Sequence, residues 1–378
     1  MADDAIVIGG GLLGLATAYH LVRAGARTVL IDRADPGRAT DAGAGILSPE
    51  TSTRTASAWF TFAHQAVAYY PVLLDLLKAD EAGETGYARC GLLVVAASED
   101  EREPFANMRR RLLPGRGRQG RPSEEDLYEV SPEEARRLFP PLGRVLGAIY
   151  YRHGARVDGR LLARALRAAA ERRGLRIVHG GVDRIVVRDR SVAGVVASGD
   201  TVEARRVAIT GGAWSRALGD QLGARIAVEP QRGQIIHLRD PATETTTWPI
   251  ISAFHDHYMV PWPDSRVAAG ATRESGSGFD PRLTAAGVRE VLTEALRVAP
   301  GLGDWEISEM RVGLRPLSAD GLPVLGAIPG VDGVYVATGH GPSGLQLGPY
   351  SAKIVAEMML GGKPSVDLTP FRVDRFRV

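Results

Sequence analysis

The chain begins with the pattern of a strand, a glycine-rich turn, a helix and a second strand. Ala5–Ile8 is apolar and rich in β-branched side chains, which is typical of a buried parallel strand. Residues 9–14 match G-x-G-x-x-G, and residues 15–31 predict a helix followed by a second strand. Asp32 ends that strand 18 residues after Gly14, close to the spacing of a carboxylate that binds a ribose hydroxyl. These four parts in this order predict a βαβ unit that binds a dinucleotide.

The glycines of this turn have separate roles in such a unit. Gly9 permits the tight turn, Gly11 lets the backbone approach a pyrophosphate, and Gly14 lets the helix pack closely on the strand. Leu12 and Leu13 complete the turn before the helix, whose free N–H groups and positive dipole end face the phosphates. A glycine-rich turn without a ligand is the alternative, and the turn alone does not distinguish NAD from FAD.

Size, charge and cysteine content narrow the class of protein. A chain of 378 residues is too long for one small core, so we expect two interlocked domains. The 46 basic and 44 acidic residues give a net charge of +2, which argues against a nucleic-acid-binding surface. Cys90 is the only cysteine in the sequence, which excludes an internal disulfide bond and a cysteine-based metal cluster.

The hydropathy of the chain indicates its location. The sequence has no run of about 18 consecutive apolar residues, so we expect no membrane span. The first predicted strand starts close to Met1, so we expect no signal peptide. These features predict a cytoplasmic protein.

Glycine turns that carry chemistry occur at both ends and in the middle of the chain, so we expect a discontinuous nucleotide-binding domain. It would comprise residues 1–50, 150–225 and 310–378, and residues 51–149 and 226–309 would form the substrate-binding domain. Periodicity predicts helices at residues 56–80, 98–113, 132–138, 158–174, 284–298 and 345–360. It predicts further strands at residues 91–96, 176–179, 182–208 and 333–338.

Several further segments carry a family resemblance. They are Thr40–Pro49, Ala155–Asp158, Thr210–Ser215, Pro230–Gln234, Tyr258–Pro261, Gly270–Glu274, Gly313–Gly326 and Ala337–Gly341. Within them, R-V-D, G-A-W, P-Q-R-G-Q, G-L-R-P and A-T-G-H resemble motifs of the FAD-dependent D-amino-acid oxidase superfamily. The resemblance covers nearly the whole chain and is strongest to the glycine oxidase and sarcosine oxidase-like branch.

This resemblance implies a fold and a cofactor. The fold is α/β, with a Rossmann-type FAD-binding domain and a discontinuous α+β substrate domain, as in D-amino-acid oxidase. The FAD is expected to be non-covalent, because Cys90 does not lie where sarcosine oxidases attach their flavin. The cofactor-binding residues that the resemblance and the first turn imply are Gly9, Gly11, Leu12, Leu13, Gly14, Asp32, Arg33, Thr40, Ala44, Gly45, Ile46, Val182, Gly211, Gly212, Trp214, Arg315, Gly341, Ser343, Gly344, Leu345 and Gln346.

The turn at residues 339–344 has a physical role if a flavin binds there. A reduced flavin carries negative charge on the side of N1 and the C2 oxygen, and a helix N-terminus directed at that side stabilises the charge. Three glycines within these six residues imply close approach of the backbone. A plain strand-to-helix turn is the alternative.

Arg315 is the candidate that binds a substrate carboxylate. It stands between Leu314 and Pro316, and a guanidinium in an apolar setting requires an anionic partner. In the family, the matching arginine holds the carboxylate of the substrate, and the tyrosine that matches Tyr258 forms a hydrogen bond with it. A structural salt bridge at Arg315 and a purely apolar role for Tyr258 are the alternatives.

Two further residues are expected at the substrate pocket. Ile46 matches an apolar residue beside the flavin ring, where ordinary packing is the alternative. Arg273 falls at the mouth of the pocket, where it either contacts the substrate or pairs with Glu274 or Asp280.

One departure from the family pattern bears on the substrate. Related glycine oxidases often have arginine and asparagine where this chain has Pro342 and Ser343. The loss of these polar groups predicts a site that is wider or less polar than that of a glycine oxidase. His255 and His257 lack a third ligand for a metal site, and His340 is expected to be structural.

The resemblance implies an enzyme that transfers the α-hydrogen of a carboxylated amine as hydride to flavin N5. The imine then hydrolyses, and O2 reoxidises the flavin with formation of H2O2. A dehydrogenase that passes electrons to a quinone or another carrier is the main alternative, and a flavin-binding subunit without turnover is another. The substrate (glycine, an N-alkylglycine, an N-carboxymethyl amine or a D-amino acid), the pathway and a homo-oligomeric state remain open.

Overall fold

The N-terminal unit forms as predicted, with β1 (Ala5–Ile8), α1 (Leu12–Arg23) and β2 (Thr28–Asp32). The computed structural model describes residues 3–118 and 121–376. β1 lies inside a six-stranded sheet of order β20-β21-β13-β1-β2-β9, in which only the β20–β21 pair is antiparallel. The other strands of this sheet are β9 (Arg176–His179), β13 (Val207–Ile209), β20 (Val324–Ala327) and β21 (Val334–Thr338). Distant parts of the chain therefore build one sheet, as a discontinuous domain requires.

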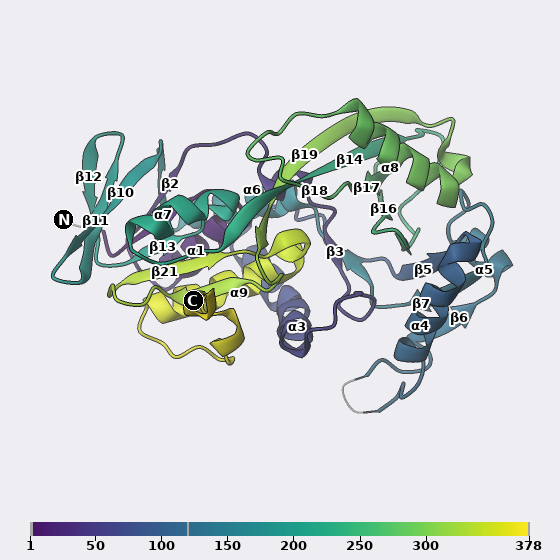
Figure 1. Cartoon of the computed structure of the whole chain (residues 1–378), viewed down its shortest axis with the longest axis horizontal. Helices are drawn as coiled ribbons and strands as arrows, with labels where there is room; N and C mark the ends of the chain where they lie inside the picture. The colour runs from purple at the N-terminus through teal and green to yellow at the C-terminus, as the bar shows by residue number, and fades with distance from the viewer. Residues whose placement is uncertain (1–2, 119–120, 377–378) are drawn as a thin grey trace.

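Both faces of this sheet are covered, because its side chains alternate between two apolar layers. Ala5 and Val7 face a core formed with four helices, and Ile6 and Ile8 face a second core on the opposite side. The helices are α1, α3 (Ser57–Ala79), α6 (Gly159–Arg172) and α9 (Gly344–Met359). The opposite side is covered by α7 (Ser215–Gln221) and by an antiparallel sheet of β10 (Val182–Arg188), β11 (Ser191–Ala197) and β12 (Asp200–Glu203). Figure 1 shows this small sheet at one end of the molecule.

The second half of the molecule is built on a larger, mostly antiparallel sheet. Its order is β18-β14-β17-β16-β15-β5-β7-β6, and β19 pairs along the whole of β14. The strands are β5 (Leu92–Ala96), β6 (Leu127–Val130), β7 (Gly147–Tyr151), β14 (Val228–Arg239), β15 (Ile250–Ala253), β16 (Tyr258–Trp262), β17 (Arg266–Gly270), β18 (Glu274–Ser275) and β19 (Glu306–Ser318).

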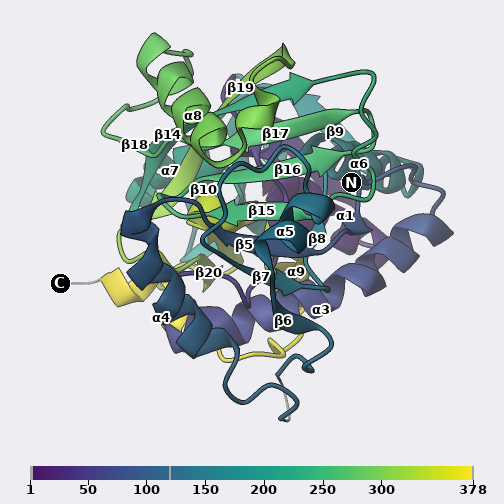
Figure 2. The ribbon, with the colours of Figure 1, turned by 90° about the vertical axis from the view of Figure 1, so that its right-hand side faces the viewer.

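Helices cover both faces of the large sheet. α5 (Pro132–Leu138) and α8 (Ala285–Val298) pack on one face around Leu93, Phe139 and Val291. α4 (Arg102–Leu112) packs on the other face. Figure 2 shows α8 at the upper left and α4 at the lower left. Val260 and Trp262 lie on the α4 face, so Tyr258 shares that face because side chains alternate along β16.

Short elements join the two halves. They are α2 (Ala39–Ala42), β3 (Ile46–Leu47), β4 (Ala88–Arg89) and β8 (Ala155–Arg156), of which the strands form a small sheet of order β3-β8-β4. In Figure 1, β3 lies between the two large sheets. α2 packs against both α6 and β19, so the segment that holds it belongs to the interface between the halves.

The predicted helices are present, with one difference. The helix expected at residues 98–113 starts as a 3-10 turn over Glu99–Glu101 and continues as α4. The buried Glu101 carboxylate explains this start, because it accepts hydrogen bonds from the N–H groups of Ala97 and Ser98 and pairs with Arg297.

Helix α3 lies apart from the domain expected for it. The sequence places residues 51–149 in the substrate domain, but Trp59, Phe62 and Leu73 of α3 belong to the core of the six-stranded sheet. The periodicity of α3 shows an apolar face without showing which sheet the face covers. We therefore propose to group α3 with the nucleotide-binding half and to keep the other boundaries as predicted. In the described ranges 3–118 and 121–376, no helix has both the length and the apolar character needed to cross a membrane.

Candidate active site

A cavity of about 940 Å³ runs between the two halves of the molecule. Residues from both large sheets line it, including the first turn, the segment at residues 38–46 and the start of α9. All of the predicted cofactor-binding residues line this cavity except Gly14 and Ser343. Tyr258, Arg273 and Arg315 line the same cavity, so the structure brings the two predicted sets of residues together.

The first turn is closed too tightly for side chains. Gly9 has a φ of +105°, a conformation that L-residues rarely adopt. A Cβ atom on Gly14 would lie 1.7 Å from the Gly9 carbonyl oxygen. Gly14 therefore packs α1 against the turn and does not reach the cavity, which is the role expected of the third glycine.

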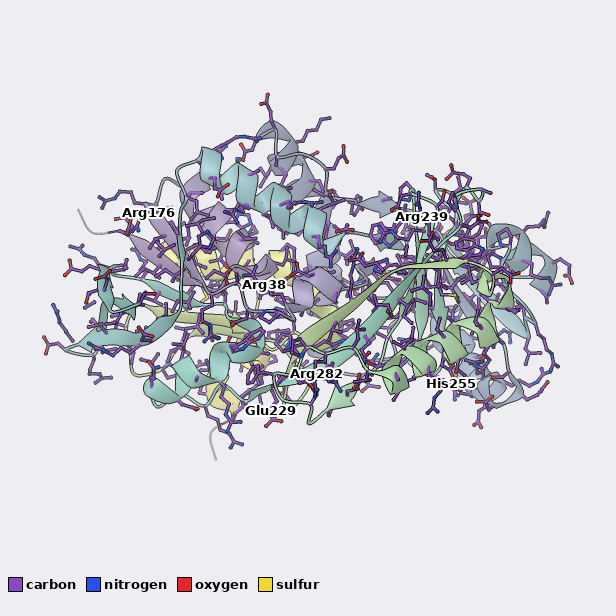
Figure 3. The ribbon with its side chains drawn as sticks, turned by 90° about the horizontal axis from the view of Figure 1, so that it is seen from above. Arg38, Arg176, Glu229, Arg239, His255 and Arg282 are labelled. Atoms are coloured by element: carbon purple, nitrogen blue, oxygen red, sulfur yellow. The ribbon has the colours of Figure 1, made fainter. Side chains whose placement is uncertain are left out.

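Asp32 reaches the turn from the end of β2. Its Oδ1 atom accepts a hydrogen bond from the Gly10 N–H at 2.9 Å, and its Oδ2 atom pairs with Arg38. Figure 3 shows Arg38 near the middle of the molecule. Arg38 lines the cavity but was not expected from the sequence, because none of the motifs considered there includes it. Arg33, on the same loop, pairs with Asp35.

The segment at residues 40–46 lies against the R-V-D segment. The N–H of Val157 donates to the Gly45 carbonyl at 2.9 Å, and a Cβ atom on Gly45 would lie 1.8 Å from the Val157 carbonyl oxygen. Gly45 is thus required for this contact, and Ala44 and Ile46 on either side of it line the cavity. Thr40 Oγ1 accepts the N–H of Leu12 at 3.0 Å, which joins this segment to the start of α1.

Val182 lies at the start of β10, and Gly211, Gly212 and Trp214 form the turn after β13. The ring of Trp214 stacks on Phe279, with 5.3 Å between the ring centroids. The cavity is lined by Val182, Gly211, Gly212, Trp214 and Phe279.

The turn before α9 presents unpaired polar atoms to the cavity. Gly341 has a φ of +54°, and no side chain caps the N-terminus of α9 at Ser343. Gln346 Oε1 accepts the N–H of Ser48, while Gln346 Nε2 is buried without a hydrogen-bond partner among the described residues. Leu345 and Gly344 line the cavity beside it.

His340 is buried and neutral. Burial lowers its pKa to about 3. The Ser351 hydroxyl donates to the Leu347 carbonyl, so His340 Nε2 donates to that hydroxyl at 2.9 Å. His340 Nδ1 is then an acceptor, and it has no partner in residues 3–118 and 121–376.

These features fit a bound dinucleotide. The first turn is cleared of side chains, an acid stands at the end of the second strand, and α9 presents an uncapped N-terminus and the orphaned Gln346 amide to the same cavity. The cradle at Gly9, Gly11 and Asp32 would hold the adenosine and pyrophosphate, and the turn before α9 would hold the flavin.

Arg315 lies flat on the large sheet where the neighbouring strand has a glycine. A Cβ atom on Gly233 would lie 2.4 Å from the Arg315 guanidinium carbon, so only glycine leaves room for it. Arg315 Nη1 donates to the Thr272 carbonyl at 2.9 Å. Burial lowers the pKa of Arg315, because its charge is taken out of water. Within the described part of the chain, no carboxylate lies within ion-pair distance of Arg315.

Tyr258 stands next to Arg315, and its hydroxyl likewise occupies the space over a glycine. A Cβ atom on Gly270 would lie 2.9 Å from the Tyr258 hydroxyl oxygen. Burial raises the pKa of Tyr258, and the positive charges of Arg315 and Arg273 partly oppose that rise. The hydroxyl therefore stays protonated and can donate a hydrogen bond to an anion.

Arg273 pairs with neither of the acids considered from the sequence. Its Nη2 atom lies 3.1 Å from Asp256 Oδ1, whereas Glu274 and Asp280 both pair with Arg232. The strand register explains this, because Arg232 stands directly opposite Glu274 across the β14–β18 pair. Asp256 and Gly233 were missed by sequence reasoning, since their positions follow from contacts between distant strands.

His255 and His257 lie in the loop between β15 and β16, where His255 contacts Asp100 and Glu294. Among the residues that the structure describes, no three histidine, cysteine, aspartate or glutamate side chains are grouped to hold a metal ion.

The geometry fits a protein that binds a flavin dinucleotide in the cavity that Arg315 and Tyr258 also line. The sequence matches the family described as FAD dependent oxidoreductase over residues 4–358, and the chain belongs to that family. The resemblance inferred from the motifs is thereby confirmed, as are the fold class and the dependence on FAD.

Relatives of known sequence cover almost the whole chain. An uncharacterised oxidoreductase of Bacillus subtilis is 38% identical, over 97% of both chains. A glycine oxidase of Pseudomonas aeruginosa is 32% identical, over 98% of both chains. The chain is therefore a glycine oxidase-like FAD-dependent oxidoreductase.

Solved structures agree in fold. The iminodiacetate oxidase from Chelativorans has a TM-score of 0.90 and 37% identity, covering 97% of this chain and 98% of that one. The glycine oxidase from Geobacillus kaustophilus has a TM-score of 0.89 and 28% identity, covering 100% of both chains.

Proposed function

We propose that this enzyme oxidises the carbon–nitrogen bond of a small amino acid or an N-substituted glycine, with O2 as the final electron acceptor. One observation carries the proposal: Arg315 lines the cavity, and no carboxylate of the described chain neutralises it. A buried guanidinium without an acidic partner is unfavourable, and a substrate carboxylate that accepts two parallel hydrogen bonds would relieve that cost.

Residues of the chain position the substrate and leave the chemistry to the cofactor. Arg315 and Tyr258 would hold the carboxylate, and Ile46 would form the apolar wall beside the flavin ring. His340 is neutral and already donates to Ser351, so it would serve to fix the turn. FAD, when bound, would supply a two-electron acceptor for the α-hydride, while the amine nitrogen gives up a proton. O2 would take up these two electrons and two protons to form H2O2, and water would hydrolyse the imine product to an oxo acid and an amine.

The name of one relative supports a substituted amine. The Chelativorans protein is described as an iminodiacetate oxidase, and iminodiacetate is an N-carboxymethyl derivative of glycine. Pro342 lines the cavity and has no hydrogen-bond donor. An apolar or charged substituent on the amine would therefore displace no hydrogen bond of the protein at that wall. We expect an N-substituted glycine to exceed glycine by at least about tenfold in kcat/KM, or about 1.4 kcal/mol of transition-state binding.

A panel of amines tests the function. Glycine, N-methylglycine, iminodiacetate and D-alanine are compared by H2O2 formation in air and by flavin bleaching without oxygen. Bleaching without H2O2, together with reduction of an added quinone, would identify a dehydrogenase. An absence of bleaching by every carboxylated amine would reject the proposed reaction.

The Arg315→Ala variant tests the site. We expect kcat/KM to fall about 10- to 150-fold for every carboxylated substrate, because a charge-assisted hydrogen bond is lost, while the flavin spectrum is kept. Arg315→Lys should restore only part of the activity, since lysine lacks the planar fork. Arg282→Ala is the control, because the Arg282 side chain is 83% exposed. Full activity of Arg315→Ala would move the site elsewhere.

A further inference from the structure

We propose that Arg54 and Arg273 form a second carboxylate-binding site next to Arg315, so that the preferred substrate is a secondary amine with a carboxylate on each side of the nitrogen. This inference rests on the proposed function and names the class of its substrate. Arg315 of β19 and Arg273 of the loop after β17 line this end of the cavity. Arg54, from the loop before α3, lies behind Gly341 in the cavity wall.

Arg273 is held only weakly by its present partner. It follows β17 and lines the cavity, and its Nη2 atom lies 3.1 Å from Asp256 Oδ1. The Arg273 side chain is 38% exposed and the Asp256 side chain is 59% exposed. Exposed ion pairs contribute little to stability, so Arg273 can exchange this contact for a substrate carboxylate at small cost.

Arg54 reaches the cavity wall from the other side. Its Nη1 atom donates to the Gly321 carbonyl at 2.8 Å, and its guanidinium lies 5.2 Å from the centre of the Trp59 ring. Its Nη2 atom is 4.0 Å from the place that a Cβ atom on Gly341 would occupy, and Gly341 lines the cavity. In the described ranges of the chain, no acidic side chain forms an ion pair with Arg54.

The two arginines are close enough to influence each other. Burial lowers the pKa of Arg54, and the positive charge of Arg273 lowers it further. Burial is also the main cause of the lowered pKa of Arg315, to which Arg273 again adds. The guanidinium groups therefore share one electrostatic environment at the substrate end of the cavity.

The charge at this end requires more than one anion. Arg54, Arg273 and Arg315 carry three positive charges, whereas Asp256 is the carboxylate that pairs with one of them. The neighbouring acids Glu274 and Asp280 already pair with Arg232. A monocarboxylate would leave one guanidinium unbalanced, whereas a dicarboxylate balances the set and offers each carboxylate a donor.

The test compares two substrates of nearly equal shape. Iminodiacetate (N-carboxymethylglycine) has two carboxylates, and its monoamide, N-carbamoylmethylglycine, has one. For the holoenzyme, we expect kcat/KM for the dicarboxylate to exceed that for the monoamide by about tenfold or more, because a charge-assisted hydrogen bond is gained. Arg54→Gln and Arg273→Gln should each lower this ratio by about threefold or more.

Matched variants separate charge from packing. Asp256→Asn frees Arg273 from its partner, so the preference for the dicarboxylate should rise. Arg54→Lys keeps the charge and should retain more of the preference than Arg54→Gln. Arg282→Gln removes an exposed arginine beside Asp280 and should leave the ratio unchanged.

Each outcome has one meaning. Equal loss of activity towards both substrates in Arg54→Gln and Arg273→Gln would overturn the second site and indicate a structural role. Bleaching of the flavin by amines without preference for the dicarboxylate would overturn the second site and leave the proposed function standing. Failure of every amine to bleach the flavin would instead reject the proposed function.

Discussion

At the scale of single residues, the proposed carboxylate site depends on a position without a side chain. Arg315 and Gly233 lie on neighbouring strands, and the guanidinium occupies the space that a Cβ atom on Gly233 would fill. The backbone of Gly233 does not require a positive φ, so alanine is compatible with the strand. A side chain at position 233 would therefore displace Arg315 and would not strain the strand.

The Gly233→Ala variant should misplace Arg315 and spare the cofactor. We expect kcat/KM for carboxylated amines to fall about 10- to 100-fold, because small displacements of a positioning group are costly, while the flavin spectrum stays unchanged. A double-mutant cycle supplies the control. In an Arg315→Ala background, Gly233→Ala should have almost no further effect, since the group that it displaces is gone. Additive losses would show that Gly233 acts on something else.

Asp32 is the residue whose charge should matter most for FAD affinity. Its carboxylate already accepts the Gly10 N–H at 2.9 Å, which fixes it at the end of β2, where we expect it to bind the ribose hydroxyl groups. Asp32→Ala should weaken FAD binding about 10- to 150-fold in titrations of apoprotein, through loss of a charge-assisted hydrogen bond. Asp75→Ala, on the exposed side of α3, is the matched control. Equal affinity in both variants would reject the assignment.

At the scale of elements, the paired strands β14 and β19 connect the substrate site with a buried histidine. His237 on β14 is 2% exposed, and its Nδ1 atom accepts a hydrogen bond from Arg266 at 2.5 Å. An arginine only donates, so His237 is neutral. Burial, followed by the charges of Arg311 and Arg266, lowers its pKa from 6.5 to about 3.

This histidine should make the fold sensitive to acid. Between pH 6.5 and about 3, the unfolded chain binds a proton at His237 that the folded chain does not bind. Stability is therefore full above pH 6.5 and falls with decreasing pH, by about 1.4 kcal/mol per pH unit for one such group. The thermal midpoint of His237→Gln should decline less than that of the wild type from pH 6.5 to 4.5. His179→Gln, at an exposed position, is the control, and identical slopes in wild type and His237→Gln would contradict the prediction.

At the scale of the whole molecule, local sequence patterns predicted the helices and strands. Contacts between segments that are distant in the sequence could not be predicted in this way. The turn at residues 9–14 and the helices α5, α6, α8 and α9 depend on neighbouring residues, so their patterns are visible in the sequence. The pairing of Arg38 with Asp32 and of Arg273 with Asp256 depends on how loops meet after the sheets form. The grouping of α3 with the nucleotide-binding half, which we propose, was not predictable for a similar reason, because an apolar face does not show which surface it covers. The cytoplasmic location and the oligomeric state stay predictions.

The single cavity between the halves has a consequence for cofactor retention. The first turn, the α9 turn and Arg315 all border one space. We therefore expect a carboxylate held at Arg315 to contact a flavin bound in the same cavity. Binding energies that are coupled in this way are reciprocal, and the factor by which the ligand tightens FAD binding equals the factor by which FAD tightens ligand binding. We expect acetate, which cannot be oxidised here, to lower the dissociation constant of FAD in the wild type and to have no such effect in Arg315→Ala. The enzyme would then keep its cofactor most firmly while it is occupied, and the idle enzyme would be the form that loses it.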